Sequence, residues 1–220
     1  MRICVIIPTH NESKEIFRLV KEIKEQNLDV LVVDDGSMDN TSQIASDAGA
    51  AVLKNPVNEG KGSCLRKGFA YALEHNFDAV ITMDGDGQHL PKDLQYFISS
   101  TGISKSDIFI GNRMLQTKNM PGIRILTNKF MSWLISLLSK QDIPDTQCGF
   151  RLIRRAVLEK IKLQTSKYEI ETEILIKAAQ SGFKIESVPV TTVYRGEKSQ
   201  INPFADTLRF LKFIIKVNRK

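Results

Sequence analysis

The sequence lacks the features that mark several classes of protein, and cysteine is the first of them. Its 220 residues include only three cysteines, Cys4, Cys64 and Cys148, which are scattered and odd in number. This excludes a disulfide-stapled scaffold and favours a reducing compartment. There is no CxxC pair and no Cys/His cluster, so a structural zinc site is not expected.

Long hydrophobic runs and the common nucleotide-loop motifs are also missing. The longest apolar stretch, residues 130–138, is too short to cross a bilayer, and Met1 leads directly into an apolar run without a secretory signal. We therefore expect a cytoplasmic protein with at most peripheral contact with the cytoplasmic face of a membrane. Neither GxxxxGKS/T nor GxGxxG follows the first apolar run, which argues against P-loop and Rossmann sites. Without an RNA- or DNA-binding motif, nucleic acid is not an expected partner.

What the chain does contain is enough apolar material for one globular core. Hydrophobic residues make up 42% and charged residues 25% of the chain. This composition fits a single α/β domain. The 31 Lys and Arg residues outnumber the 25 Asp and Glu residues, and the net charge is +6. Such a charge favours anionic partners such as nucleotide phosphates or acidic lipid.

Apolar runs alternate with helical patterns through the first 113 residues. Short apolar runs that end in turn residues are typical of buried parallel strands. The order predicts a single doubly wound, mostly parallel sheet with helices on both faces. Strands are expected at residues 2–8, 30–33, 51–54, 79–83 and 107–110, with helices up to residue 26, at 41–48, at 63–75 and from 91 onward.

The stretch DAVITMDGDGQH, residues 78–89, carries the strongest chemical signal. Asp84 and Asp86 follow an apolar strand on glycine-bent backbone, so both carboxylates can turn toward one point. Open parallel sheets bind ligands at this edge, and hard divalent cations prefer oxygen ligands. The pattern predicts a site for a metal ion and a diphosphate, although a solvated Asp-Gly turn would show the same letters. An EF-hand is excluded because His89 and Gln95 stand where its glycine and closing glutamate belong.

Two other strand ends carry acidic residues as well. Glu12 follows the first strand, and Asp34 and Asp35 follow the second. Carboxyl ends of parallel strands share one rim, so these groups would repel one another unless a cation or hydrogen-bond donors offset their charge. Asp39, a few residues further on, is expected only to cap the next helix.

Four ordered motifs resemble those of a known family. VIIPTHNE (5–12), VVDDGSMDNT (32–41), NEGKG (58–62) and MDGDGQH (83–89) together resemble the family-2 inverting glycosyltransferases of the GT-A fold. GNR (111–113), CGFRLIRR (148–155) and VPVTTVYRGEKS (188–199) look like the branch of dolichyl-phosphate mannosyltransferases and polyprenyl-phosphate glycosyltransferases. The resemblance covers nearly the whole chain. It implies a transferase domain over residues 1–200, with a nucleotide-sugar-binding half (1–113) and an acceptor half (114–200).

The resemblance also implies a role for each matching residue. His10 stands where the mannosyltransferases often have tyrosine; from the residues themselves, His10 and His89 are expected to form local hydrogen bonds rather than to ligate a metal. Arg113 could be a surface arginine, but its place at a strand end on the acidic rim favours a function; Arg195 and Lys198 could form a solvated basic loop. The implied roles are base and ribose contact for Pro8, His10, Glu12, Val33 and Asp35; ligation of Mg2+ or Mn2+ for Asp84, Asp86 and Gln88, with Gly85 close to the nucleotide; and phosphate or sugar contact for Arg113, Arg195 and Lys198.

The implied reaction moves a hexose, mannose or glucose, from GDP-mannose or UDP-glucose to a polyprenyl or dolichyl phosphate. A phosphate acceptor is already an anion and needs no strong base. If the acceptor is instead a saccharide or another small hydroxyl compound, a base is required, and Asp145 is the candidate by its place in the family pattern. Glu169, Glu171 and Glu173 form a second acidic cluster, which we expect to be a solvated helix face or an acceptor-loop contact.

Two segments bear on the question of lipid. Residues 124–139 form an apolar helix that contains Trp133, and the final segment, residues 201–220, contains a basic amphipathic helix at 204–217. A helix of the second kind can lie in an anionic membrane interface, or it can pack on the core.

Two alternatives from other classes remain open. A sugar-phosphate nucleotidyltransferase would also combine an α/β fold with acidic metal ligands, but it is expected to open with a GxGTR-like loop in place of PTHNE. A non-catalytic nucleotide-binding subunit is expected to have lost a metal ligand, whereas Asp84, Asp86 and Gln88 are all present.

Overall fold

The computed structural model describes residues 1–115, 117 and 120–193. The strands predicted for the first 113 residues are all present, with ends that differ from the expected ones by a few residues at most. The elements are β1 (Ile3–Thr9), α1 (Ile16–Lys24), β2 (Asp29–Asp34), α2 (Thr41–Asp47), β3 (Ala51–Lys54), α3 (Lys61–Glu74), β4 (Ala79–Thr82), η1 (Pro91–Asp93), α4 (Leu94–Ile103), β5 (Ile108–Asn112), α5 (Gly122–Ser139), β6 (Arg151–Arg154), α6 (Arg155–Lys160), α7 (Glu169–Gln180) and β7 (Ile185–Pro189).

The strands form one sheet of seven in the order β3-β2-β1-β4-β6-β5-β7. The pairs β1–β2, β1–β4, β2–β3 and β5–β7 are parallel, whereas β6 is antiparallel to both β4 and β5. The prediction of a single, mostly parallel sheet is therefore confirmed. Strands β6 and β7 have no counterpart among the predicted strands; they come from the predicted acceptor half, and β6 inserts beside β4.

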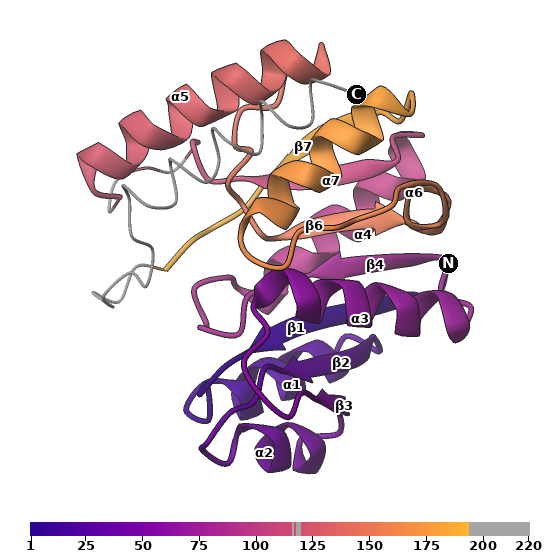
Figure 1. Cartoon of the computed structure of the whole chain (residues 1–220), viewed down its shortest axis with the longest axis vertical. Helices are drawn as coiled ribbons and strands as arrows, with labels where there is room; N and C mark the ends of the chain where they lie inside the picture. The colour runs from indigo at the N-terminus through magenta and orange to yellow at the C-terminus, as the bar shows by residue number, and fades with distance from the viewer. Residues whose placement is uncertain (116, 118–119, 194–220) are drawn as a thin grey trace.

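Helices cover both faces of the sheet, as predicted. Figure 1 shows α3 and α7 in front of the sheet and α1 and α4 behind it. Helix α1 follows the predicted apolar face, because Ile16, Leu19, Val20 and Ile23 are all fully buried. Helix α5 lies at the outer end of the molecule and packs on α7 (Figure 1).

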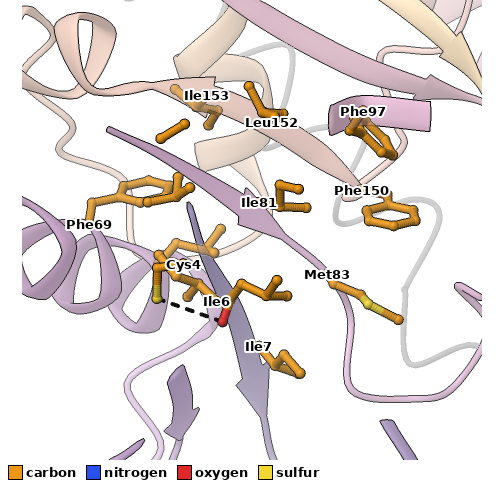
Figure 2. Close-up of a cluster of buried hydrophobic side chains, with 14 of the residues drawn as sticks. Cys4, Ile6, Ile7, Phe69, Ile81, Met83, Phe97, Phe150, Leu152 and Ile153 are labelled. Atoms are coloured by element: carbon orange, nitrogen blue, oxygen red, sulfur yellow. Dashed lines mark hydrogen bonds between the residues drawn. The ribbon is translucent and has the colours of Figure 1, made fainter. Parts of the chain in front are cut away.

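The core runs through the middle of the sheet. Figure 2 shows buried hydrophobic side chains that neighbouring strands contribute to one cluster, among them Ile6 of β1, Ile81 of β4 and Leu152 of β6. The Phe97 and Phe150 rings pack with centroids 4.5 Å apart and extend this core toward α4. All three cysteines are buried as free thiols, in agreement with the absence of a disulfide framework.

The direction of the strands decides where the loops converge. Strands β1, β2, β3 and β4 run the same way, so their carboxyl ends lie along one edge of the sheet. Because β6 runs the opposite way, the residues that precede it, 145–150, reach the same edge. The carboxyl ends of β5 and β7 complete this edge, so both halves of the chain contribute to it.

Candidate active site at the carboxyl edge of the sheet

The loops after β2 and β4 meet at the end of β1. The Asp35 amide donates a hydrogen bond of 2.8 Å to the Thr9 carbonyl oxygen. From the other side, Gly85 comes so close that a Cβ on it would lie 2.7 Å from Thr9 Cγ2. Asp35 and Asp84 therefore belong to loops that touch the same residue, as a shared site requires.

The DGDGQH loop bends sharply after β4. Gly87 has a φ of +73°, which favours glycine, and the Gln88 amide donates to Asp86 Oδ1 at 2.9 Å. Gln88 in turn accepts a hydrogen bond of 3.0 Å on its carbonyl oxygen from the Val193 amide. The half-buried carboxyl groups of Asp84 and Asp86 thus sit on a loop held at both ends by backbone contacts.

Lys61, at the start of α3, is the central cation of this edge. Its Nζ lies 2.5 Å from Asp84 Oδ1 and 2.7 Å from Glu171 Oε1, so one ammonium group joins α3, the DGDGQH loop and α7. Burial disfavours the charge on Lys61, but the two carboxylates raise its pKa above the ordinary value, and the group stays protonated. For Asp84, burial acts to raise the pKa, yet Lys61 and neighbouring positive groups bring it down to about 2.

Gly149, just before β6, makes room for this cluster. A Cβ at Gly149 would lie 2.8 Å from Glu171 Oε1, 3.0 Å from Asp84 Oδ2 and 3.1 Å from Lys61 Nζ. Three charged groups from three separate segments thus surround one point, and a larger residue at position 149 would have to displace the ends of their side chains. Lys61 and Gly149 were not among the site residues predicted from the sequence. Their place within two motifs that resemble the family, NEGKG and CGFRLIRR, was the only feature that could have indicated a role for them.

The second acidic cluster does not form a solvated face, contrary to that prediction. Glu171 contacts Lys61 in the site. Glu173 is 1% exposed and accepts hydrogen bonds from the amides of Gln164 and Thr165 as well as from Lys177. The solvated-face alternative was wrong because the segment before α7 folds back over the first turns of this helix, which helical spacing alone could not indicate. The other alternative, an acceptor-loop contact, stays a prediction.

Asp35 is 4% exposed and holds the NEGKG turn in place. Its Oδ1 accepts from Asn55 Nδ2 and from the Glu59 amide, both at 2.8 Å, and its Oδ2 accepts from the Gly60 amide at 2.8 Å. Burial acts to raise the pKa of Asp35, but these donors lower it below the ordinary value. The turn that carries Lys61 is thereby tied to the end of β2.

Both histidines of the motifs form local contacts, as expected. His10 Nδ1 lies 3.0 Å from the Asp35 carbonyl oxygen and connects the ends of β1 and β2. His89 is 3% exposed, stacks on Phe150 with ring centroids 5.0 Å apart, and forms an isolated β-bridge with Thr192. Burial lowers the pKa of His89 to about 4, so the ring is neutral near pH 7.

Arg113 and Asp145 form a buried ion pair at the end of β5. Arg113 Nε donates to Asp145 Oδ2 at 2.7 Å, and Arg113 Nη2 donates to Asp145 Oδ1 at 2.9 Å. The Arg113 amide also donates to Asp145 Oδ2, at 3.0 Å. Asp145 is 0% exposed, and its Oδ1 also accepts a hydrogen bond of 3.3 Å from the Gln147 amide. The role of Asp145 as a general base stays a prediction; in this structure its carboxylate orients the guanidinium group of Arg113.

Some of the remaining predicted site residues lie at the carboxyl edge of the sheet, and the others lie outside the residues that the structure describes. Pro8 and Val33 are register partners on β1 and β2. The Glu12 amide, just past β1, donates a hydrogen bond of 2.9 Å to Thr41 Oγ1 of α2. Arg195, Lys198 and the predicted C-terminal helix lie outside the described residues. The described chain ends at Val193, whose amide is bonded to the DGDGQH loop.

Asp84 and Asp86 could offer a cation two carboxylates, which is fewer ligands than a cation bound by protein alone requires. Among residues 1–115, 117 and 120–193, no three His, Cys, Asp or Glu side chains form a group that could hold a metal ion. Mg2+ is commonly bound by one or two carboxylates together with water and substrate phosphates. The donor set therefore fits a cation that is held jointly by the protein and a diphosphate.

The fold and this charged edge together define an α/β enzyme with its ligand site at the carboxyl ends of parallel strands. A family model described as glycosyl transferase family 2 matches residues 4–162. The chain belongs to glycosyl transferase family 2 and is a glycosyltransferase, which decides against a nucleotidyltransferase and against a non-catalytic subunit.

Two curated relatives place the chain in the polyprenyl-phosphate branch. The UDP-N-acetylglucosamine–dolichyl-phosphate N-acetylglucosaminyltransferase of Methanococcus voltae is 30% identical over 87% of this chain and 86% of its own length. The polyprenol monophosphomannose synthase of Mycolicibacterium smegmatis is 30% identical over 88% of this chain and 78% of its own length.

Solved structures show the same fold. The glucosyl-3-phosphoglycerate synthase of Mycobacterium tuberculosis, in complex with Mn2+, UDP-glucose and phosphoglyceric acid, superimposes with a TM-score of 0.77 at 18% identity. The match covers 98% of this chain and 79% of that chain. The predicted GT-A fold is confirmed by this likeness.

Proposed function

We propose that this glycosyltransferase moves a hexose, mannose or glucose, from a nucleotide-diphosphate sugar to a polyprenyl phosphate. GDP-mannose and UDP-glucose are the leading donors. The observation that carries the proposal is the ion pair of Asp84 with Lys61 at the sheet edge, where the charge of Arg113 also acts on Asp84 and where Asp86 lies on the same loop. The names of the two relatives support the acceptor class, since each acts on a polyprenyl or dolichyl phosphate.

The nucleoside of the donor would bind at the ends of β1 and β2. We assign base and ribose contacts to this region because its loops are joined by the bond of His10 to the Asp35 carbonyl. The residues assigned to this role are Pro8, His10, Glu12, Val33 and Asp35, with Gly85 beside the nucleotide.

A divalent cation, Mg2+ or Mn2+, would be held by Asp84 and Asp86, with Gln88 as a third oxygen donor. When bound, it would neutralise negative charge on the leaving nucleoside diphosphate. Lys61 already neutralises Asp84 without any ligand, and Glu171 is a second partner that can retain the ammonium group when Asp84 turns to another cation.

Positive side chains would complete the stabilisation of the leaving group. Arg113 is held by Asp145 with its planar guanidinium oriented at the sheet edge, where it can donate to phosphate or sugar oxygens. We also assign phosphate contacts to Arg195 and Lys198. Val193, the last residue that the structure describes, is bonded through its amide to the Gln88 carbonyl of the DGDGQH loop.

The acceptor phosphate needs orientation more than deprotonation. A polyprenyl monophosphate is an anion at neutral pH, so its oxygen can attack the anomeric carbon without a strong base. This agrees with the burial of Asp145, which would be the base for a hydroxyl acceptor.

Binding of donor fragments tests the proposal. Calorimetric titration of GDP, UDP and their sugars, each with and without Mn2+, should reveal one preferred diphosphate whose affinity rises with Mn2+. Asp86→Ala should abolish the Mn2+ effect, because one of only two carboxylates is lost. Equal binding of all nucleotides, or an unchanged Mn2+ effect in Asp86→Ala, would contradict the assignment of donor site and metal ligands.

Gly149→Ala should impair the site without unfolding the protein. The new methyl group would press against the flexible ends of Glu171, Asp84 and Lys61, which can move aside at the cost of their mutual geometry. We expect transfer activity to fall by about tenfold or more, with a free energy of unfolding within about 1 kcal/mol of the original. Gly102→Ala is the matched control, because nothing lies within 4 Å of its added Cβ. Full activity of Gly149→Ala would show that this cluster is not part of the site.

A further inference from the structure

Helix α5 turns its large apolar side chains outward. They recur at intervals of three and four residues, so they lie on one side of the helix. We call this surface the α5 apolar face; it consists of Ile123, Leu126, Phe130, Trp133 and Leu137, whose exposed fractions lie between 52% and 73%.

The opposite side of α5, which packs on the protein, is mixed in character, and Leu134 and Leu138 lie partly buried against the core there. Asn128, Ser132 and Ser139 are buried there, beside Met131 and Ile135. Ser132 Oγ also accepts a hydrogen bond of 2.9 Å from the Thr146 amide. A surface helix normally keeps its large apolar side chains on the buried side, whereas α5 carries a second row of them on its exposed side. A contiguous exposed apolar face of this kind marks an interaction surface.

The positive charge of α5 favours an anionic partner. Residues 122–140 contain Arg124, Lys129 and Lys140 and no acidic residue. A second copy of the same face would bring like charges together, whereas an anionic surface would complement them. The neighbouring rings of Phe130 and Trp133, with centroids 6.1 Å apart, suit the boundary between headgroups and acyl chains. In the part of the chain that the structure describes, no helix has the length and hydropathy to cross a bilayer.

The α5 apolar face is also connected to the active site. The residue after Asp145, Thr146, is the one bonded to Ser132 of α5, and Asp145 holds Arg113. Leu115, which is 68% exposed, lies between Arg113 and the start of α5. The exposed apolar side chain of Leu115 is thus only two residues along the chain from Arg113, a predicted phosphate-binding residue.

We propose that the α5 apolar face docks onto an anionic lipid bilayer, with α5 lying along the membrane surface. The purpose of this orientation rests on the proposed function: it would bring Arg113 to the depth of the lipid headgroups, where a polyprenyl phosphate presents its phosphate. The docking itself stands on the exposed side chains and the charge of α5.

Trp133 makes the docking directly observable, because it is the only tryptophan in the chain. The full chain is mixed with vesicles of equal parts phosphatidylglycerol and phosphatidylcholine, and tryptophan emission is recorded. We expect a shift to shorter wavelength and quenching by lipids brominated on their acyl chains, since the indole leaves water for the bilayer. High salt should weaken the binding, because the basic residues contribute.

Variants separate this face from the rest of the surface. Phe130→Ser combined with Leu137→Ser keeps Trp133 as the reporter and should weaken vesicle binding by about tenfold or more. Phe17→Ser combined with Ile103→Ser is the matched control, because these apolar side chains are also exposed but lie on α1 and α4. The control should bind vesicles like the original protein.

Three results would overturn the proposal. The first is an unchanged Trp133 emission with vesicles. The second is emission that is already at short wavelength and inaccessible to acrylamide without lipid, which would show that another part of the chain or a second copy covers the face. The third is vesicle binding unaffected by the α5 substitutions, which would assign binding elsewhere, including residues 201–220. Transfer to a short, water-soluble prenyl phosphate is measured in parallel, so that failure of docking is distinguished from failure of the proposed function.

Discussion

Asp84→Asn is expected to lower the transfer rate by about a thousandfold while leaving the protein folded. Asparagine has nearly the same shape as aspartate but lacks the charge that would hold a divalent cation. It also lacks the charge that attracts Lys61 at 2.5 Å. The fold should survive because Lys61 keeps its second carboxylate, Glu171, at 2.7 Å. Rates are measured with the preferred donor and a polyprenyl phosphate over a range of Mn2+ concentrations, alongside urea unfolding.

Asp47→Asn is the appropriate control for this change. Asp47 is exposed on α2, with a hydrogen bond from Gln43 only four residues away, so its charge is remote from the sheet edge. The transfer rate of the Asp47→Asn variant should equal that of the original protein. If Asp84→Asn retained most of its activity at every Mn2+ concentration, the proposed metal–diphosphate site would have to be abandoned.

Asp145→Ala is expected to lower the free energy of unfolding by about 3 kcal/mol and to reduce transfer severely. The substitution leaves the largely buried Arg113 guanidinium without the carboxylate that receives two of its hydrogen bonds. It also leaves the Arg113 amide without its acceptor. Urea unfolding gives the stability, and steady-state kinetics give the activity of the folded fraction. Asp142→Ala serves as the control, since Asp142 is exposed on the same loop and should change neither quantity by much.

A double substitution distinguishes the two roles considered for Asp145. If Asp145 positions Arg113, the effects of Asp145→Ala and Arg113→Ala on stability should be strongly non-additive, because each removes the same interaction. A base, by contrast, would be needed for chemistry but not for stability. An Asp145→Ala protein that is as stable as the original yet inactive would therefore restore the general-base interpretation.

The regular part of the fold was predictable because its signals are local. Strands β1, β2 and β4 are runs of apolar residues buried on both faces, and α1 carries its apolar residues at helical spacing. Strand β6 was not predictable from such signals. Its sequence RLIR begins with Arg151, which is 1% exposed and donates to the carbonyl oxygens of Cys148, Thr146 and Glu171. An arginine buried in this way has no counterpart in hydrophobic patterning.

The site was predictable to the same extent. The position of Asp84 and Asp86 after an apolar strand, and of Asp35 after another, indicated the shared edge. The sequence did not indicate a role for Lys61, because a lysine in a glycine-rich turn is usually solvated. Its partner Glu171 stands 110 residues further along the chain. Helix α5 was expected to be apolar, but hydropathy does not reveal which of its sides faces the protein.

From the sequence alone follow the order of strands and helices over the first 113 residues, the family to which the chain belongs, and the carboxylates that strand and turn residues bring to one edge. These features depend on neighbours in sequence, through side-chain periodicity and the conformational freedom of glycine. The tertiary structure alone decided that β6 runs antiparallel, that Lys61 joins Asp84 to Glu171, that Asp145 serves Arg113, and that α5 faces outward with its large side chains. Those outcomes depend on which distant segments pack together, and burial and charge pairing across the folded chain select them.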